Sequence, residues 1–131
     1  MGEYNILMPR DFPPKRAKHG APTIHFDIDH GVVYFSKGIC RLMDIDGGDR
    51  VMILQSKSDP ATFGFKKTDG EEGFPLRKRG SSRVGLCFVN IALVRLILST
   101  FGSLRNTMVQ VGIEPVDGAY WTMKASITHK D

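Results

Sequence analysis

The chain has 131 residues, of which 41% are hydrophobic and 24% are charged, a composition typical of a folded globular protein and not of a disordered one. This length suits a single domain that buries its core without disulfides. No apolar run approaches the ~20 residues that a membrane-spanning helix needs, and the formal net charge of +4 is compatible with a polyanionic partner.

Residues 1–22 are rich in proline and show no hydrophobic period, so this segment is predicted to be an extended, flexible arm. The cations at its centre are Lys15, Arg16 and Lys18. Residues 23–131 are predicted to form one globular domain.

The first part of this domain has the pattern of strand, strand, helix and strand. Residues 23–29 alternate apolar and polar side chains, and residues 31–36 are a β-branched and aromatic run, as in strands. Ser36 is expected to cap a helix near residues 37–44, which a glycine-rich turn ends. The next strand begins at Val51.

The same order returns in the second part of the domain. Residues 85–90 align without a gap with residues 31–36, and Asn90 takes the place of the capping Ser36. We therefore predict an internal strand–strand–helix–strand repeat whose two helices are related by a pseudo-twofold axis. The two units and the final strand are expected at residues 23–67, 73–114 and 119–128.

These elements predict an α+β fold, namely a small β-barrel-like domain of mainly antiparallel strands with two short helices. The second helix is expected near residues 90–100, with one apolar face toward the core. Its buried side chains are predicted to be Leu93, Leu96 and Ile97.

The sequence gives little support to catalysis. It contains no Ser/His/Asp order, nucleophile elbow or phosphate loop. Cys40 and Cys87 are interpreted as reduced core thiols of a cytoplasmic protein without a signal peptide. A zinc site would need more soft ligands at closer spacing. We therefore expect no cofactor, no metal and no enzymatic activity.

One polar triplet leaves a metal-dependent enzyme open as an alternative. His25, Asp27 and Asp29 share one face of the first predicted strand, and one imidazole with two carboxylates can bind a divalent metal. Alternation along a half-buried strand generates such triplets without any metal. The preferred interpretation is therefore the solvent face of a strand.

Basic residues concentrate near the start of the second repeat unit. They are Arg77, Lys78, Arg79 and Arg83, with no acid among them. Arg77 and Arg79 are two residues apart and are expected on one face of a strand, with Lys78 beside the apolar Phe74 and Leu76. This basic hairpin, together with the cations of the arm, predicts contacts to nucleic-acid phosphates.

A turn that ends in Gly48-Asp49 follows the first helix, and an apolar strand follows the turn. This order resembles the Gly-Asp box of the cradle-loop barrels, which include AbrB-type swapped-hairpin transcription factors and the double-psi and related barrels. The likeness is carried by residues 31–36, 39–43 and 48–51. In AbrB-type chains a short strand ending in a basic residue follows, as residues 63–67 do here. The resemblance implies a DNA-binding regulator.

Two features depart from that family. AbrB-type proteins usually have one unit and dimerise, whereas this chain has two, and the second unit has Gly102-Ser103 in place of Gly-Asp. The first box also has a structural explanation, since the Asp49 carboxylate can accept from turn amides and Gly48 allows a positive φ. Asp49 is accordingly expected to be structural.

Three functions are carried forward from the sequence. The first is a nucleic-acid-binding module, the second a non-catalytic structural or protein-interaction domain, and the third a metal-dependent enzyme. The expected partners are nucleic acid or another protein, with no membrane. The chain is expected to be a monomer or a homodimer.

Overall fold

The computed structural model describes residues 5, 21–78 and 84–130. Within this part, two α-helices accompany ten strands in two sheets, one of six strands and one of four. All the strand pairs are antiparallel. The α+β class expected from the sequence is confirmed, and the two sheets are not closed into a barrel.

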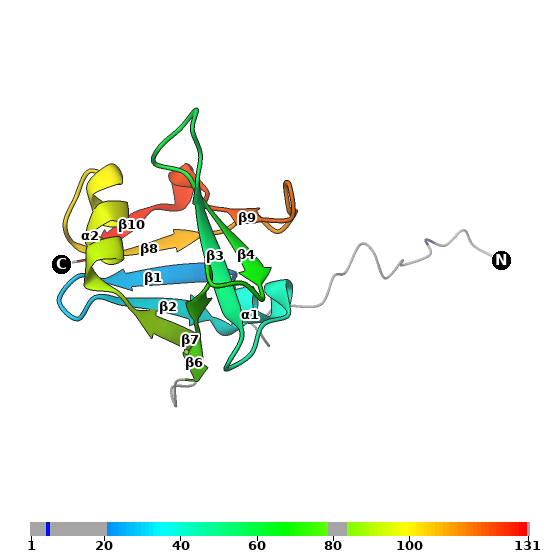
Figure 1. Cartoon of the computed structure of the whole chain (residues 1–131). Coiled ribbons are helices and arrows are strands. Elements are labelled where there is room, and N and C mark those ends of the chain that lie inside the picture. Colours follow the sequence, from blue (N-terminus) through cyan, green and yellow to red (C-terminus); the bar gives the residue numbers. More distant parts are fainter. Residues whose placement is uncertain (1–4, 6–20, 79–83, 131) are drawn as a thin grey trace.

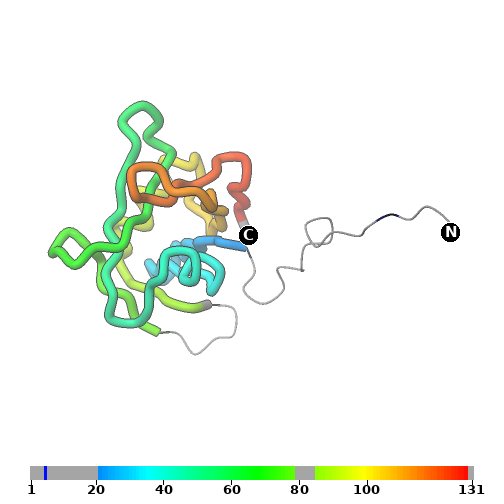
Figure 2. The backbone as a smooth tube through the Cα atoms, turned by 90° about the vertical axis from the view of Figure 1, so that its right-hand side faces the viewer, coloured from blue at the N-terminus to red at the C-terminus, as the bar shows by residue number. Residues whose placement is uncertain are grey.

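The six-stranded sheet has the order β10-β8-β1-β2-β7-β6. Its strands are β1 (Thr23–Asp27), β2 (Val32–Ser36), β6 (Arg77–Lys78), β7 (Val84–Val89), β8 (Asn106–Gln110) and β10 (Thr128–Lys130). The four-stranded sheet has the order β5-β3-β4-β9. Its strands are β3 (Arg50–Gln55), β4 (Phe63–Thr68), β5 (Phe74–Pro75) and β9 (Tyr120–Trp121). Figure 2 shows β3 and β4 on one side of the interior and β1 on the other.

Each helix follows a central strand of the six-stranded sheet. Helix α1 (Lys37–Met43) follows β2, and α2 (Ile91–Thr100) follows β7. Because β2 and β7 are antiparallel, the helices lie at opposite ends of the sheet (Figure 1). Both predicted caps form: Ser36 Oγ accepts from the Ile39 amide at 3.3 Å, and Asn90 Oδ1 from the Leu93 amide at 3.0 Å.

The internal repeat is visible in the register of the central strands. In the alignment of the two units, Val32 corresponds to Leu86 and Phe35 to Val89. The ladder pairs Val32 with Val89 and Phe35 with Leu86, so exchanging the units leaves this ladder unchanged. The order of elements, β1-β2-α1-β3 and then β6-β7-α2-β8, repeats as well.

The buried face of α2 differs from the prediction. Ile97 is fully buried and Leu93 half-buried as part of the core, but Leu96 is 51% exposed. Val94 and Leu98 are fully buried instead. Both sets of residues fit a helical period, and the contacts of α2 with β1 and β2 select the second set.

The expected strand over residues 119–128 is interrupted. Strand β9 pairs with β4, a 3-10 turn follows at Lys124–Ser126, and β10 pairs with β8. The chain thus leaves the four-stranded sheet and joins the six-stranded one. Ser126 stabilises this crossing, because its Oγ accepts from the Gln110 amide at 2.8 Å.

Candidate functional site

The Gly-Asp turn joins α1 to β3 and holds the segment between β5 and β6. Gly48 has φ +92°, and its amide donates to the Leu76 carbonyl at 2.9 Å. The Leu76 amide in turn donates to the Asp49 carbonyl at 2.9 Å. The Asp49 carboxylate accepts from the Asp46 amide at 2.8 Å, so it stabilises the turn that positions Leu76.

This attachment breaks the strand that the sequence predicts over the basic hairpin. Phe74 and Pro75 pair with β3 in one sheet, whereas Arg77 and Lys78 pair with β7 in the other. Leu76 lies between them and is buried. Arg77 and Lys78 are both exposed, so the expected alternation of faces is wrong at this point. The bonds from the Gly-Asp turn to Leu76 account for the break.

Lys78 does not extend beside Phe74 and Leu76 as predicted. Its aliphatic carbons lie over Gly47, where an added Cβ would come within 2.9 Å of the Lys78 Cγ. Its Nζ is 3.8 Å from Asp46 Oδ1. Lys78 therefore covers the Gly-Asp turn, and its charge is partly balanced by a carboxylate.

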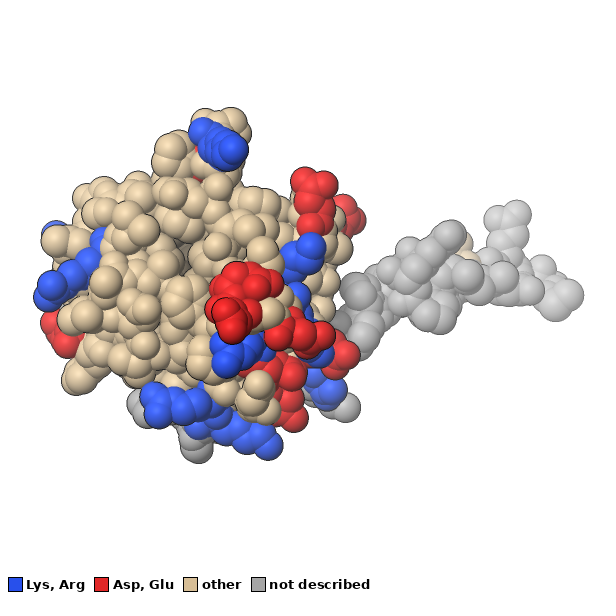
Figure 3. Space-filling view, in the orientation of Figure 1, with Lys and Arg blue, Asp and Glu red and all other residues tan. Residues whose placement is uncertain are grey.

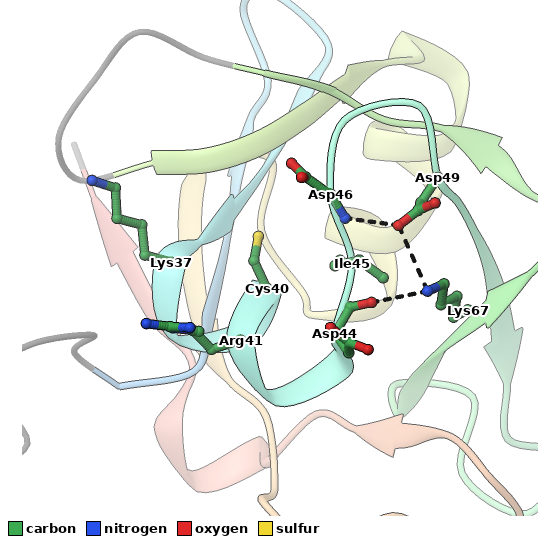
Figure 4. A pocket seen from close by; sticks show the side chains of 8 residues that line it. All are labelled: Lys37, Cys40, Arg41, Asp44, Ile45, Asp46, Asp49 and Lys67. Carbon is green, nitrogen blue, oxygen red and sulfur yellow. Dashed lines mark hydrogen bonds and ion pairs between the residues drawn. The ribbon is translucent and has the colours of Figure 1, made fainter.

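A hollow of about 690 Å³ opens between α1, the Gly-Asp turn and β4. Figure 4 shows its lining side chains, which are Lys37, Cys40, Arg41, Asp44, Ile45, Asp46, Asp49 and Lys67. Lys67 neutralises the acidic side: its Nζ donates to the Asp44 carbonyl at 3.0 Å and is 3.7 Å from Asp49 Oδ2. The negative charge on this side of the hollow is thus partly balanced by the Lys67 ammonium.

The opposite side of the hollow is basic. Lys37 and Arg41 are four residues apart on α1, and Figure 4 shows both extending away from Asp49 and Lys67. Lys37 also adjoins β7, since an added Cβ on Gly85 would lie 3.5 Å from the Lys37 Cα. Both side chains are exposed. The sequence reasoning missed these two cations, although their spacing on the polar face of a predicted helix was the available signal.

Cys40 lies between the two sides of the hollow. Burial raises the pKa of its thiol to about 11, because a thiolate is poorly solvated there. Its Sγ donates to the Phe35 carbonyl at 3.9 Å. A protonated thiol is a poor nucleophile, so the arrangement does not favour covalent chemistry at Cys40.

Basic side chains gather along the lower edge of the molecule, where Figure 1 places β6, and acidic side chains gather above them (Figure 3). Lys67, Lys78 and Lys124 have carboxylate partners. Within the described part of the chain, Lys37 and Arg77 have none. These two cations are therefore available to an external anion.

The remaining predicted cations cannot be placed. Residues 79–83 and 6–20 lie outside the described residues. The predicted contacts of Arg79, Arg83, Lys15, Arg16 and Lys18 thus stay predictions from the sequence. Arg77 and Lys78 are the members of the predicted site that the structure describes.

The polar triplet of the first strand does not form a metal site. Asp27 Oδ1 accepts from the amides of Asp29 and His30 at 3.0 and 3.2 Å, and its Oδ2 is 3.0 Å from His30 Nδ1. Burial alone would raise the pKa of Asp27, but the hydrogen bonds from His30 and Asp29 lower it by more. The pKa of Asp27 is therefore below its usual value. Asp27 thus closes the β1–β2 turn, and no group of three metal-binding side chains occurs among the residues described.

No helix in the described part of the chain is both long and apolar enough to cross a membrane. No protein-family model, curated protein or solved structure matches the chain. The resemblance to the cradle-loop barrels accordingly depends on the motif residues themselves.

Proposed function

We propose that the protein binds nucleic acid, and that it contacts phosphates through a basic surface formed by Lys37 and Arg41 of α1 and Arg77 of β6. The observation that carries the proposal is the convergence of exposed cations from two elements on one face of β7. Lys37 lies over Gly85, and Arg77 is paired with Cys87. Gly85 and Cys87 are two residues apart and therefore share a face of the strand.

The charge balance of this surface supports an anionic ligand. Phosphate contacts come chiefly from Lys and Arg side chains that are not already neutralised. Lys37 and Arg77 fit this description, whereas Lys78 and Lys67 are paired with Asp46 and Asp49. The resemblance to AbrB-type proteins adds support, and with it we propose a role as a DNA-binding regulator.

Salt dependence of binding tests the proposal. Fluorescence anisotropy with random-sequence duplex and single-stranded oligonucleotides would give log K against log salt, and each phosphate contact contributes about −0.9 to the slope on duplex DNA. Arg77→Ala and Lys37→Ala should each make the slope shallower by about that amount, on all sequences alike.

Lys124→Ala is the matched control, because the Lys124 ammonium is already 2.9 Å from the Asp59 carboxylate. This variant should leave the slope unchanged. If the folded wild-type protein has no measurable affinity for DNA or RNA at about 50 mM salt, where electrostatic binding is strong, the proposal is wrong. The protein-interaction domain then becomes the leading alternative.

A further inference from the structure

An apolar cleft adjoins the basic surface at the point where β5 gives way to β6. Its volume is about 240 Å³, and its lining residues are Phe74, Pro75, Arg77, Phe88 and Val89. The cleft exists because the chain changes sheets at Leu76, which places β5 of one sheet next to the end of β7 of the other. One uninterrupted strand over residues 74–78 would have left no such cleft.

The aromatic wall of the cleft is rigid on one side and accessible on the other. The rings of Phe74 and Phe88 are stacked, with centroids 4.8 Å apart and planes at 16°. Phe88 is only 3% exposed and fixes the stack in the core, whereas Phe74 is half-buried. Val89, which is 53% exposed, forms the rim together with Pro75.

We propose that this cleft receives one nucleobase of a single-stranded nucleic acid while Arg77 contacts a neighbouring phosphate. The inference rests on the proposed function and specifies its ligand. The cleft combines a flat aromatic wall with a cation that has no carboxylate partner among the described residues, and unpaired bases are recognised by stacking beside such cations. Duplex bases are already stacked on one another and cannot enter without being flipped out.

The size and charge of the cleft decide against a folded protein segment as the ligand. The volume suits a single planar ring and is too small for the side chains of a helix. The cation that lines it, Arg77, matches a phosphate that flanks the base. DNA and RNA share this chemistry, and the 2′-hydroxyl is the group that separates them.

The decisive experiment compares oligonucleotides with and without bases. Oligo-dT, oligo-rU and an abasic oligonucleotide of the same length and charge would be titrated into the full chain by anisotropy. We expect both base-bearing strands to bind about tenfold more tightly than the abasic strand, as removal of one stacking contact implies. A further comparison of oligo-dU with oligo-rU, which differ only in the 2′-hydroxyl, identifies the preferred sugar.

Two variants locate the effect. Phe74→Leu keeps an apolar side chain but removes the ring, and it should abolish the preference for base-bearing strands while leaving the salt slope unchanged. Leu104→Ala, at a residue that is 62% exposed and outside the cleft, is the control and should change nothing. Thymidine monophosphate titrated into the wild-type protein should also shift the Val89 methyl resonances, a measurement that needs no variant.

The outcomes separate this inference from the proposed function. If abasic and base-bearing strands bind equally, or the Val89 resonances do not move, the cleft is not a base site, although phosphate binding still stands. If no strand binds, both ideas fail together.

Discussion

The two halves of the repeat begin their helices in the same way but present different surfaces. Ser36 and Asn90 occupy the same position and cap the same amide of their helices. The exposed side of α1 carries Lys37 and Arg41, whereas that of α2 carries Arg95 together with the apolar Ile91 and Leu96. The repeat therefore preserves the backbone framework and one exposed arginine, whereas the position of Lys37 is taken by the apolar Ile91 in the second copy.

The turns after the two helices show the same division. Gly48 and Gly102 have φ values of +92° and +83°, and an added Cβ at either would meet no described atom within 4 Å. Both glycines are thus needed for their backbone conformation and not for space. Asp49 then adds a hydrogen bond through its carboxylate. Among the residues described, Ser103 bonds only through its amide, to the Leu98 carbonyl at 3.3 Å. Of the two turns, the one that holds β5 and β6 therefore has the additional side-chain hydrogen bond.

The largest expected effect concerns the side chains that the two helices bury in the core. Ile97 of α2 and its counterpart Met43 of α1 are both buried. Ile97→Ala and Met43→Ala should each lower the free energy of unfolding by about 2–5 kcal/mol, whereas Leu96→Ala should stay within about 0.5 kcal/mol. Urea midpoints would measure this. Equal losses for Leu96→Ala and Ile97→Ala would show that the buried face of α2 is wrongly assigned.

A smaller effect should distinguish the two turns. Asp49→Ala removes a charged hydrogen-bond acceptor and should lower the free energy of unfolding by about 1.5 kcal/mol, whereas Ser103→Ala should change it little. Asp49→Asn is the control, since its amide oxygen can still accept from the Asp46 amide. Thermal unfolding would test the series, and a loss for Ser103→Ala as large as that for Asp49→Ala would contradict it.

The smallest effect compares the helix caps. Asn90→Ala should lower the free energy of unfolding by about 1 kcal/mol, the usual loss for an N-cap. Ser36→Ala should cost more, because Ser36 Oγ also accepts from the Thr23 amide and donates to the Ala21 carbonyl, both at 3.0 Å. Ser36→Thr keeps the hydroxyl and serves as the control. Chemical denaturation would measure both losses. A larger loss of unfolding free energy for Asn90→Ala than for Ser36→Ala would contradict this prediction.

Local signals made much of the fold predictable. Helix caps, glycine turns and alternation depend on hydrogen bonds and sterics within a few residues. For that reason both helices, the β1–β2 hairpin and the repeat were predicted from the sequence. The structural character of the Gly-Asp turn was predictable for the same reason, since an aspartate accepting from its own turn is a short-range interaction.

Long-range contacts decided the rest. The division of residues 74–78 between two sheets depends on bonds from Leu76 to Gly48 and Asp49, which no local period encodes. The same division left Arg77 and Lys78 both exposed and opened the cleft beside Phe74. Likewise, the sequence by itself determined that α2 is amphipathic, but several faces of a mostly apolar helix satisfy that period. Packing against β1 and β2 chose among them, because only the assembled sheet defines where water is excluded.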